Sequence, residues 1–191
     1  MKVETIEIAG LAGALTALRL PFGKEVRSTI TGKTDSYIAK NNTTGDRTHL
    51  IVWDGSVDIN NKDLALLQTL VKRGDEHAKV VRGINVWAKI TAPVFLWAEA
   101  ECYRAGHERL ASESTMHIDC RGLTGQELQE AKAAIPMGKE LTKVDMFSYQ
   151  ALRKMVAQRH NHRLPEWHQF IDWIKTLPLA EELIFVGLET E

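Results

Sequence analysis

Apolar residues recur at helical spacing in the last third of the chain. Tyr149, Leu152, Met155 and Val156 lie three or four residues apart, so a helix there would place one apolar stripe against a core. The residue before a proline is pushed out of the helical region, so Pro165 should end this unit and open a second helix. That second helix is expected to bury a further apolar set, namely Phe170, Ile171, Trp173 and Ile174.

The rest of the chain mixes strand and helix patterns. Residues 1–8 alternate between the two sides of a strand, and residues 80–90 also favour a strand. Helices are predicted over residues 10–20, 61–73, 93–110 and 125–134, with Gly74 ending the second and Gly106 weakening or ending the third. The mixture indicates an α+β fold.

Two segments give less regular signals. Residues 22–61 are dominated by Gly, Thr, Asn and Asp, and residues 37–40 and 49–53 are predicted to pair as a hairpin across the turn at residues 41–46. Residues 181–191 are compatible with a last strand or with an interface arm. We therefore expect a single domain over residues 1–191, with a divergent loop or hairpin insert around residues 22–60.

Composition narrows the function. The chain has 191 residues, of which 44% are hydrophobic, enough for one sizeable core. The formal net charge of −1 argues against an extended nucleic-acid surface, so any anion site must be local. Cys102 and Cys120 suggest neither a disulfide framework nor a zinc site. No apolar run approaches the roughly 20 residues that span a bilayer, and no signal peptide is evident, so we expect a soluble cytoplasmic protein with no membrane partner.

The candidate chemistry lies where basic side chains crowd the end of the first C-terminal helix. The cluster consists of Arg153, Lys154, Arg159, His160, His162 and Arg163. Such cations suit the negative end of a helix dipole, and they are equally compatible with a phosphate or nucleotide site. Residues 112–117, SESTMH, also allow two interpretations. They form either a turn or helix cap, or a set of phosphate ligands.

Other polar and aromatic residues have plainer interpretations. Glu99 and Glu101 are expected to be salt-bridged or solvated, and the tryptophans at 97, 167 and 173 to lie in the core or at a subunit interface. We predict no metal site, because no carboxylate or cysteine is spaced to complete a ligand set with the histidines at 160, 162 and 168.

Three segments, in this order and spacing, resemble the flavin-dependent thymidylate synthases, also called thymidylate synthase complementing proteins. They are ITAPVFLWAEAECYR at 90–104, SESTMH at 112–117, and the helix FSYQALRKMVAQRHNHRLPEW at 147–167. MKVETIEI, LLQTLVKRG and KITAPVF are also similar to that family's first strand, to a helix before its flavin-contact loop, and to a strand-to-helix junction. The resemblance implies a central, mostly antiparallel sheet flanked by helices, and a homotetramer whose sites use several subunits.

Carried over position by position, the resemblance also implies residue roles. Arg159 matches the arginine that contacts the uracil ring and is the implied catalytic residue. The implied nucleotide-binding residues are Arg104, Glu113, Ser114, Thr115, Gln150 and Arg163, and the implied flavin-contacting residues are His77, Arg82, His117 and His162. The chain departs from the family at Cys102 and Tyr103, which stand where an arginine and a histidine are expected.

The implied activity is modification of a deoxyuridine nucleotide at C5 of uracil with FAD, with NADPH and a methylene-folate donor as further reactants. A cation near the carbonyl oxygens of the ring would stabilise the negative charge that develops when C5 attacks, and Arg159 would remain protonated in that role. The alternatives are a protein that only binds or sequesters a nucleotide, and a structural oligomer. The nucleotide hypotheses require Arg104 and Arg159 to meet around one anionic guest.

Overall fold

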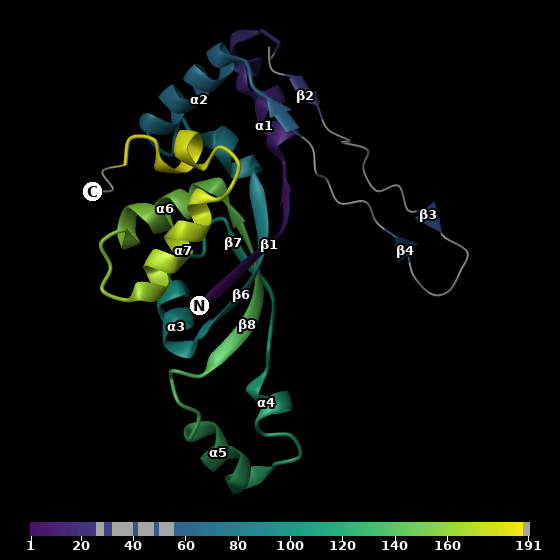
Figure 1. Ribbon diagram of the computed structural model, residues 1–191, viewed down its shortest axis with the longest axis vertical. Helices are drawn as coiled ribbons and strands as arrows, with labels where there is room; N and C mark the ends of the chain where they lie inside the picture. The colour runs from purple at the N-terminus through teal and green to yellow at the C-terminus, as the bar shows by residue number, and fades with distance from the viewer. Residues whose placement is uncertain (26–28, 32–39, 42–47, 50–55, 189–191) are drawn as a thin grey trace.

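A four-stranded antiparallel sheet forms the centre of the protein (Figure 1). The computed structural model describes residues 1–25, 29–31, 40–41, 48–49 and 56–188. The strands of the sheet lie in the order β1-β6-β8-β7, with the bounds Lys2–Ala9, Asn85–Pro93, Glu140–Ser148 and His107–Ser112. The predicted α+β class and the antiparallel central sheet are therefore confirmed.

Helices cover one face of this sheet and extend beyond both of its ends. The covering helices are α3 (Val94–Ala100), α6 (Tyr149–Arg159) and α7 (Pro165–Lys175). Beyond one end lie α1 (Leu11–Leu18) and α2 (Asn61–Lys72), and beyond the other lie α4 (Thr115–Ile118) and α5 (Gly125–Ala133). The described residues also form three short helical turns, namely the 3-10 helices η1 (Leu20–Phe22) and η2 (Lys79–Gly83) and the π-helix η3 (Glu181–Phe185).

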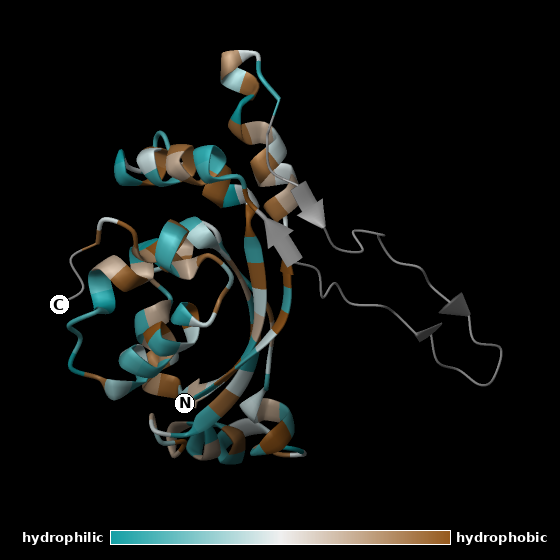
Figure 2. Ribbon diagram, turned by 45° about the horizontal axis from the view of Figure 1, so that its top comes forward, coloured by the Kyte–Doolittle hydropathy of each residue, from teal (hydrophilic) through white to brown (hydrophobic). Residues whose placement is uncertain are grey.

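Alternation along β6 decides which face of the sheet is buried. Val86, Ala88 and Ile90 are at most 1% exposed and face the helices, whereas Lys89 is exposed. Figure 2 shows the sheet curving around the helices on that side. The same alternation on the neighbouring strand β8 places Lys143, Asp145 and Phe147 on the covered face.

The two predicted C-terminal helices are confirmed. Leu152 and Val156 on α6 are fully buried, and the Ser148 hydroxyl caps the helix by accepting a hydrogen bond from the Ala151 N–H at 3.2 Å. Pro165 occupies the first turn of α7, where its missing N–H leaves no hydrogen bond unmade. The position of Pro165 in the sequence therefore predicted the turn between α6 and α7 correctly.

Residues 101–112 correct the sequence prediction. The helix expected over residues 93–110 ends at Ala100, and β7 follows it. Gly106 has a φ of +76°, and a Cβ at this position would overlap the Ser148 hydroxyl, so the chain turns where there is no side chain. The Ser148 N–H donates to the Gly106 carbonyl at 2.7 Å, at the start of the β7–β8 ladder.

The start of β6 and the existence of β8 also differ from the prediction. The strand expected from residue 80 begins at Asn85, because residues 79–83 form the 3-10 turn η2. Strand β8 was not predicted. It carries the charged residues Lys143 and Asp145 on its buried face, so its sequence lacks the apolar alternation by which half-buried strands are recognised.

The C-terminal segment is neither a strand nor an extended arm over its described part. It forms η3, which packs on α6 with Leu183 and Ile184 fully buried. Arg153 on α6 donates from Nη1 to the carbonyl oxygens of Ile184 and Val186, at 2.7 and 2.8 Å. This part of the predicted basic cluster therefore anchors the chain end.

The insert around residues 22–60 lies largely outside the described residues. Within it, β2 (Thr29–Thr31) pairs with β5 (Ser56–Asp58), and β3 (Lys40–Asn41) pairs with β4 (Thr48–His49), both antiparallel. Most of the predicted pairing of residues 37–40 with 49–53 also lies outside them, although Lys40 and His49 are partners.

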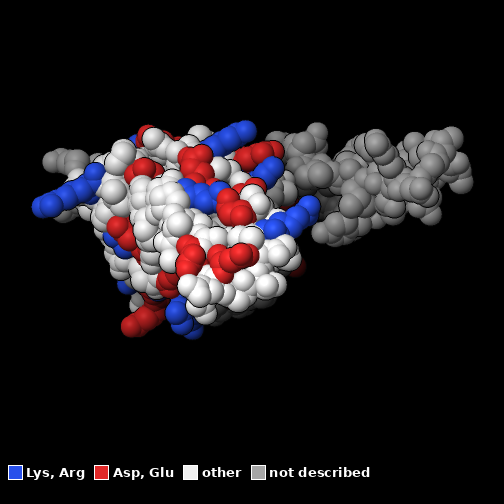
Figure 3. Space-filling model, turned by 90° about the horizontal axis from the view of Figure 1, so that it is seen from below, with Lys and Arg blue, Asp and Glu red and all other residues white. Residues whose placement is uncertain are grey.

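Two observations bear on possible contact with a membrane or a nucleic acid. Among the residues that the structure describes, no helix is both long and apolar enough to cross a membrane. Acidic and basic side chains are interspersed on the face shown in Figure 3, with no broad basic field on that face. This pattern agrees with the near-zero net charge of the sequence.

Two glycines near α1 give a matched test of the fold. Gly10 has a φ of +90°, and a Cβ there would overlap the Gly83 carbonyl, so Gly10→Ala should lower the free energy of unfolding by about 1–3 kcal/mol or more. Gly13 lies within the helix with open space around it, so Gly13→Ala should raise that free energy by about 0.5–1 kcal/mol. Urea denaturation of both variants checks the prediction. Equal stability of the two would contradict the close approach of α1 and η2.

Candidate functional site

Arg159, at the end of α6, is held by residues at the end of α3 and by α7. Its Nε donates to the Tyr103 hydroxyl at 2.9 Å, and its Nη1 donates to Oε2 of Glu99 at 3.3 Å. Its guanidinium carbon lies 4.9 Å from the ring centroid of Trp167 and 5.6 Å from that of Tyr103, within cation–π range. We call these four residues, Glu99, Tyr103, Arg159 and Trp167, the Arg159 platform.

Glu99 is the shared acceptor of the platform. Its Oε2 accepts from the Trp167 indole N–H at 2.9 Å as well as from Arg159, and it lies 3.4 Å from Nε2 of His162. His162 is itself fixed, because its Nδ1 accepts from the Leu164 N–H at 3.2 Å. One carboxylate thus joins α3, the end of α6 and the start of α7.

The environment keeps Arg159 charged and Tyr103 neutral. Burial alone would lower the pKa of the Arg159 guanidinium, but the hydrogen bonds to Tyr103 and Cys102 and the charge of Glu99 outweigh burial and raise it. Burial raises the pKa of the Tyr103 hydroxyl above its usual value, against the opposing effect of Arg159. The platform therefore presents a fixed cation and a protonated phenol.

A buried His–Asp pair lies next to the platform. His107 on β7 places its Nδ1 2.8 Å from the Tyr103 carbonyl oxygen and its Nε2 3.0 Å from Oδ2 of Asp145 on β8. Its ring stacks on Phe147, with centroids 4.4 Å apart and planes 12° apart. Since a carbonyl oxygen can only accept, Nδ1 must carry a hydrogen. His107 thereby fixes the backbone of Tyr103, a member of the platform.

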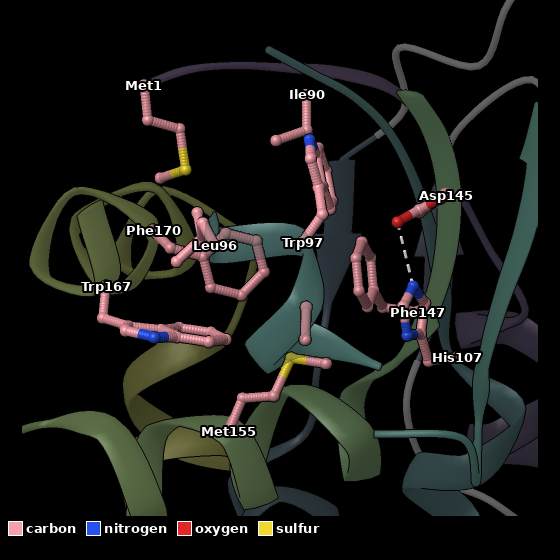
Figure 4. A pocket seen from close by; sticks show the side chains of 11 residues that line it. Met1, Ile90, Leu96, Trp97, His107, Asp145, Phe147, Met155, Trp167 and Phe170 are labelled. Atoms are coloured by element: carbon pink, nitrogen blue, oxygen red, sulfur yellow. Dashed lines mark hydrogen bonds and ion pairs between the residues drawn. The ribbon is translucent and has the colours of Figure 1, made fainter. Parts of the chain in front are cut away.

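A small cavity separates the sheet from α3, α6 and α7 (Figure 4). Its volume is about 20 Å³, enough for one or two water molecules. The lining is mostly aromatic and apolar, with Trp97, Phe147, Met155, Trp167 and Phe170 around it and the His107–Asp145 pair at one side. This cavity is too small for a nucleotide or a flavin.

Several residues predicted to bind ligand are grouped around the platform. Arg104 is exposed and directly follows Tyr103, and its Nε donates to the Glu101 carbonyl at 3.3 Å. His162 contacts Glu99, as described above, and Arg163 is exposed in the turn that follows α6. The structure therefore places Arg104 and Arg159 on neighbouring elements of one chain, although no described pocket joins them.

A second group lies where β7 leads into α4. Glu113 accepts from the Thr142 N–H at 2.7 Å through Oε2, Ser114 precedes α4, and the Thr115 hydroxyl accepts from Lys132. His117 is exposed on α4. These residues form an edge of the sheet rather than part of the platform.

The third group lies near the start of α6. Arg82 donates from Nε to Oε1 of Gln150 at 2.9 Å and from Nη2 to the Asp75 carbonyl at 2.9 Å, and His77 is exposed nearby in sequence. A hydrogen bond from Lys154 lowers the pKa of the Asp75 carboxyl, and Gln150 contributes to that shift. Arg82 and Oε1 of Gln150 already have partners within the chain, whereas the buried Nε2 of Gln150 has none among the described residues.

The four residues carried over as flavin contacts do not converge. His162 belongs to the platform group, His117 to the second group, and His77 and Arg82 to the third. Within one chain these four residues do not form a flavin pocket. Over the described residues, no cluster of three or more His, Cys, Asp or Glu side chains is arranged to hold a metal ion.

Sequence reasoning missed part of the platform. It interpreted Glu99 as salt-bridged or solvated and Trp167 as a core or interface residue, and the structure confirms the salt bridge and the burial. It assigned Tyr103 no role, although the spacing of four residues between Glu99 and Tyr103 would place both on one side of a helical segment. Only the packing of α3 against the α6–α7 turn shows that these residues surround Arg159.

Comparison with known proteins identifies the fold. The chain matches no protein-family model and no curated protein sequence. Two structures of thymidylate synthase X, the flavin-dependent enzyme of Helicobacter pylori, with FAD and dUMP are similar at a TM-score of 0.65 and 12% identity. The first match covers 99% of this chain and 100% of that one, and the second covers 98% and 99%.

A third solved structure is similar over the same extent. It is the UMP/dUMP methylase PolB of Streptomyces cacaoi bound with 5-Br dUMP, at a TM-score of 0.58 and 11% identity, covering 100% of this chain and 97% of that one. The chain therefore has a divergent fold of the flavin-dependent thymidylate synthase type, as the sequence resemblance predicted. At these identities the likeness concerns the fold alone.

The shared carboxylate of the platform gives a direct test. Glu99→Leu removes the acceptor of both the Trp167 N–H and Arg159, so it should lower the free energy of unfolding by about 1–3 kcal/mol. Glu108→Leu, at an exposed position on β7, is the matched control and should stay within about 0.5 kcal/mol of wild type. Urea titrations followed by tryptophan fluorescence provide the comparison. A Glu99→Leu variant as stable as the control would show that the platform contributes nothing to stability.

Proposed function

We propose that the protein binds a uridine 5′-monophosphate, dUMP or UMP, at the Arg159 platform and modifies its uracil ring at C5. One observation carries this proposal. The similar structures match essentially the whole chain, and uridine nucleotides are their common ligands, dUMP in the Helicobacter pylori enzyme and 5-Br dUMP in PolB. The arginine that the sequence resemblance assigns to the uracil ring is also the residue around which the platform is built.

The geometry of Arg159 suits the stabilisation of charge on a uracil ring. Contacts with Trp167, Tyr103 and Glu99 hold the guanidinium in one orientation before any ligand arrives. Its Nη2 has only the Cys102 sulfur as a hydrogen-bond partner in the described part of the chain, at 3.9 Å. A preoriented donor of this kind stabilises a developing oxyanion more than a mobile one does, because little reorganisation is needed.

The hydrogens that Arg159 and Tyr103 carry limit the chemistry that the platform can perform. Arg159 stays protonated and cannot act as a base, so it would stabilise negative charge on a carbonyl oxygen while C5 forms a bond. Tyr103 accepts from Arg159 through its oxygen, which leaves its own hydrogen available to a ligand acceptor. The site would thus polarise uracil through two adjacent donors.

The separation of the three residue groups supports a site shared between subunits. Within one chain, the platform, the β7–α4 edge and the Arg82–Gln150 pair are distinct places. The homotetramer implied by the sequence resemblance would allow the edge of one subunit to face the platform of another. A complete nucleotide site would then require assembly, and so would any FAD, NADPH or methylene-folate site.

A nucleotide-binding protein without flavin chemistry is the second candidate function. Cys102 and Tyr103 occupy the positions where the family has an arginine and a histidine, and Arg82 already bonds to Gln150 and to the Asp75 backbone. Of these three residues only Arg82 is an implied flavin contact, and its bonds within the chain leave it less available to a flavin, whereas Arg159 is retained. The two candidates therefore share the nucleotide and differ in the cofactor.

Nucleotide binding is tested first. Calorimetric titration with dUMP and UMP should show binding, and Arg159→Gln should weaken it about tenfold to hundredfold, because a hydrogen bond to a charged group contributes roughly 1.5–3 kcal/mol. Arg73→Gln, at an exposed arginine after α2, serves as the control and should bind like wild type. Equal affinity of Arg159→Gln and wild type would exclude the platform as the uracil site.

Binding of FAD distinguishes the two candidate functions. An enzyme of the first kind should show the visible absorbance of bound flavin, either as purified or after addition of FAD, and should release tritium from dUMP labelled at C5. A binder should be stabilised by dUMP, by roughly 2.7 kcal/mol at about 100 times its dissociation constant, with no response to FAD. Absence of any response to both ligands would contradict both candidates.

A further inference from the structure

Lys143 is a buried lysine whose charge has no partner. It lies on the helix-covered face of β8 and is 7% exposed. Its ammonium nitrogen lies 4.3 Å from the ring centroid of Trp97, and it makes no hydrogen bond or ion pair within the described ranges. Burial and the nearby charge of Arg109 lower the pKa of the Lys143 amine, and they outweigh the opposing charges of Asp145 and Glu101. Buried charges are ordinarily paired, so an unpaired ammonium indicates a missing partner.

The carboxylates around Lys143 make their closest contacts with other groups. Oδ2 of Asp145 is hydrogen-bonded to Nε2 of His107, and the buried Oδ1 of Asp145 has no hydrogen-bond partner among the described residues. Arg109 on β7 pairs with Oε1 of Glu101 at 2.5 Å. None of these carboxylates forms a hydrogen bond or ion pair with the Lys143 ammonium within the described residues.

Arg109 adds hydrogen-bond donors near Lys143 that are not fully used within the described residues. Its Nη2 contacts Glu101, and its Nε lies 3.8 Å from Oδ1 of Asp145, which leaves Nη1 without a partner in the described part of the chain. Lys143 and Ser112 are partners in the β7–β8 register, and the next residue, Glu113, is bonded to Thr142. Lys143 and Arg109 therefore lie between the end of α3 and the β7–α4 edge.

We propose that Lys143 and Arg109 form a binding site for a phosphate-class oxyanion. The ammonium offers three donors and the guanidinium a further N–H edge, which together match the several acceptor oxygens of a phosphate. An oxyanion here would compensate the charge that the chain leaves unpaired. The inference does not depend on uracil recognition, because inorganic phosphate is a sufficient probe.

The test compares two lysines on opposite faces of the sheet. Lys143→Met removes the charge and retains an unbranched side chain that can pack on Trp97. Lys89→Met is the matched control, since Lys89 is exposed on β6. Phosphate titrations are run against chloride at equal ionic strength, by calorimetry and thermal melting. Phosphate also stabilises folded proteins by exclusion from their surface, so the difference between the two variants is the readout.

We expect wild type and Lys89→Met to bind phosphate alike and Lys143→Met to bind it about tenfold to hundredfold more weakly, as for the loss of one charge-assisted hydrogen bond. If Lys143→Met does not fold, judged by its circular dichroism, Lys143→Gln provides the same comparison. Equal phosphate binding by the Lys143 and Lys89 variants would overturn the proposal. Absence of phosphate binding to wild type would overturn it as well.

A second pair of ligands, dUMP and deoxyuridine, shows which molecule carries the oxyanion that binds at this site. If the site takes the 5′-phosphate of the nucleotide, Lys143→Met should weaken dUMP binding and leave deoxyuridine binding unchanged. If it takes the phosphate of another ligand, inorganic phosphate binding should fall while dUMP binding stays the same. Failure of dUMP to bind wild type would remove the proposed function and leave the phosphate result standing.

Discussion

The hydrogen-bonded ladder that holds β8 between β6 and β7 positions the polar chemistry of this protein. Strand β8 supplies Lys143 and Asp145 to the covered face, and its last residue, Ser148, caps the helix that ends in Arg159. The Ser148 N–H also bonds to the Gly106 carbonyl, which sets where β7 begins. A change of register by one residue would turn every β8 side chain to the opposite face, so the ladder decides which charges are buried.

The buried charges fall into two kinds. The partly buried Glu99 and the buried Asp145 accept hydrogen bonds from neighbouring elements, Glu99 joining α3 to α6 and α7 and Asp145 joining β8 to His107 on β7. Removing one member of such a set leaves the others desolvated, which makes each set a structural unit. Lys143 is of the other kind, because Trp97 covers it without neutralising it. Natural proteins tolerate an unsatisfied buried group chiefly where function requires it.

The likeness to thymidylate synthase X and PolB at 11–12% identity is consistent with how a fold is specified. A core requires apolar residues of suitable size at the right spacing, and many sequences meet that requirement. Chemistry depends on individual side chains, so it can differ where the fold does not. In this chain the end of α3 carries Cys102 and Tyr103, and Tyr103 is a hydrogen-bond partner of Arg159.

The sequence by itself determined what local rules govern. Helical spacing and Pro165 placed α6 and α7, Gly74 ended α2, and the resemblance identified the fold and singled out Arg159. Tertiary structure decided the rest. Strands β7 and β8 exist because they pair with each other and with β6, and the π-helix forms because α6 offers it a surface and Arg153 binds its carbonyls. The grouping of Glu99, Tyr103 and Trp167 around Arg159 was likewise not readable from the chain. These features depend on contacts between residues far apart in sequence, which local spacing does not encode.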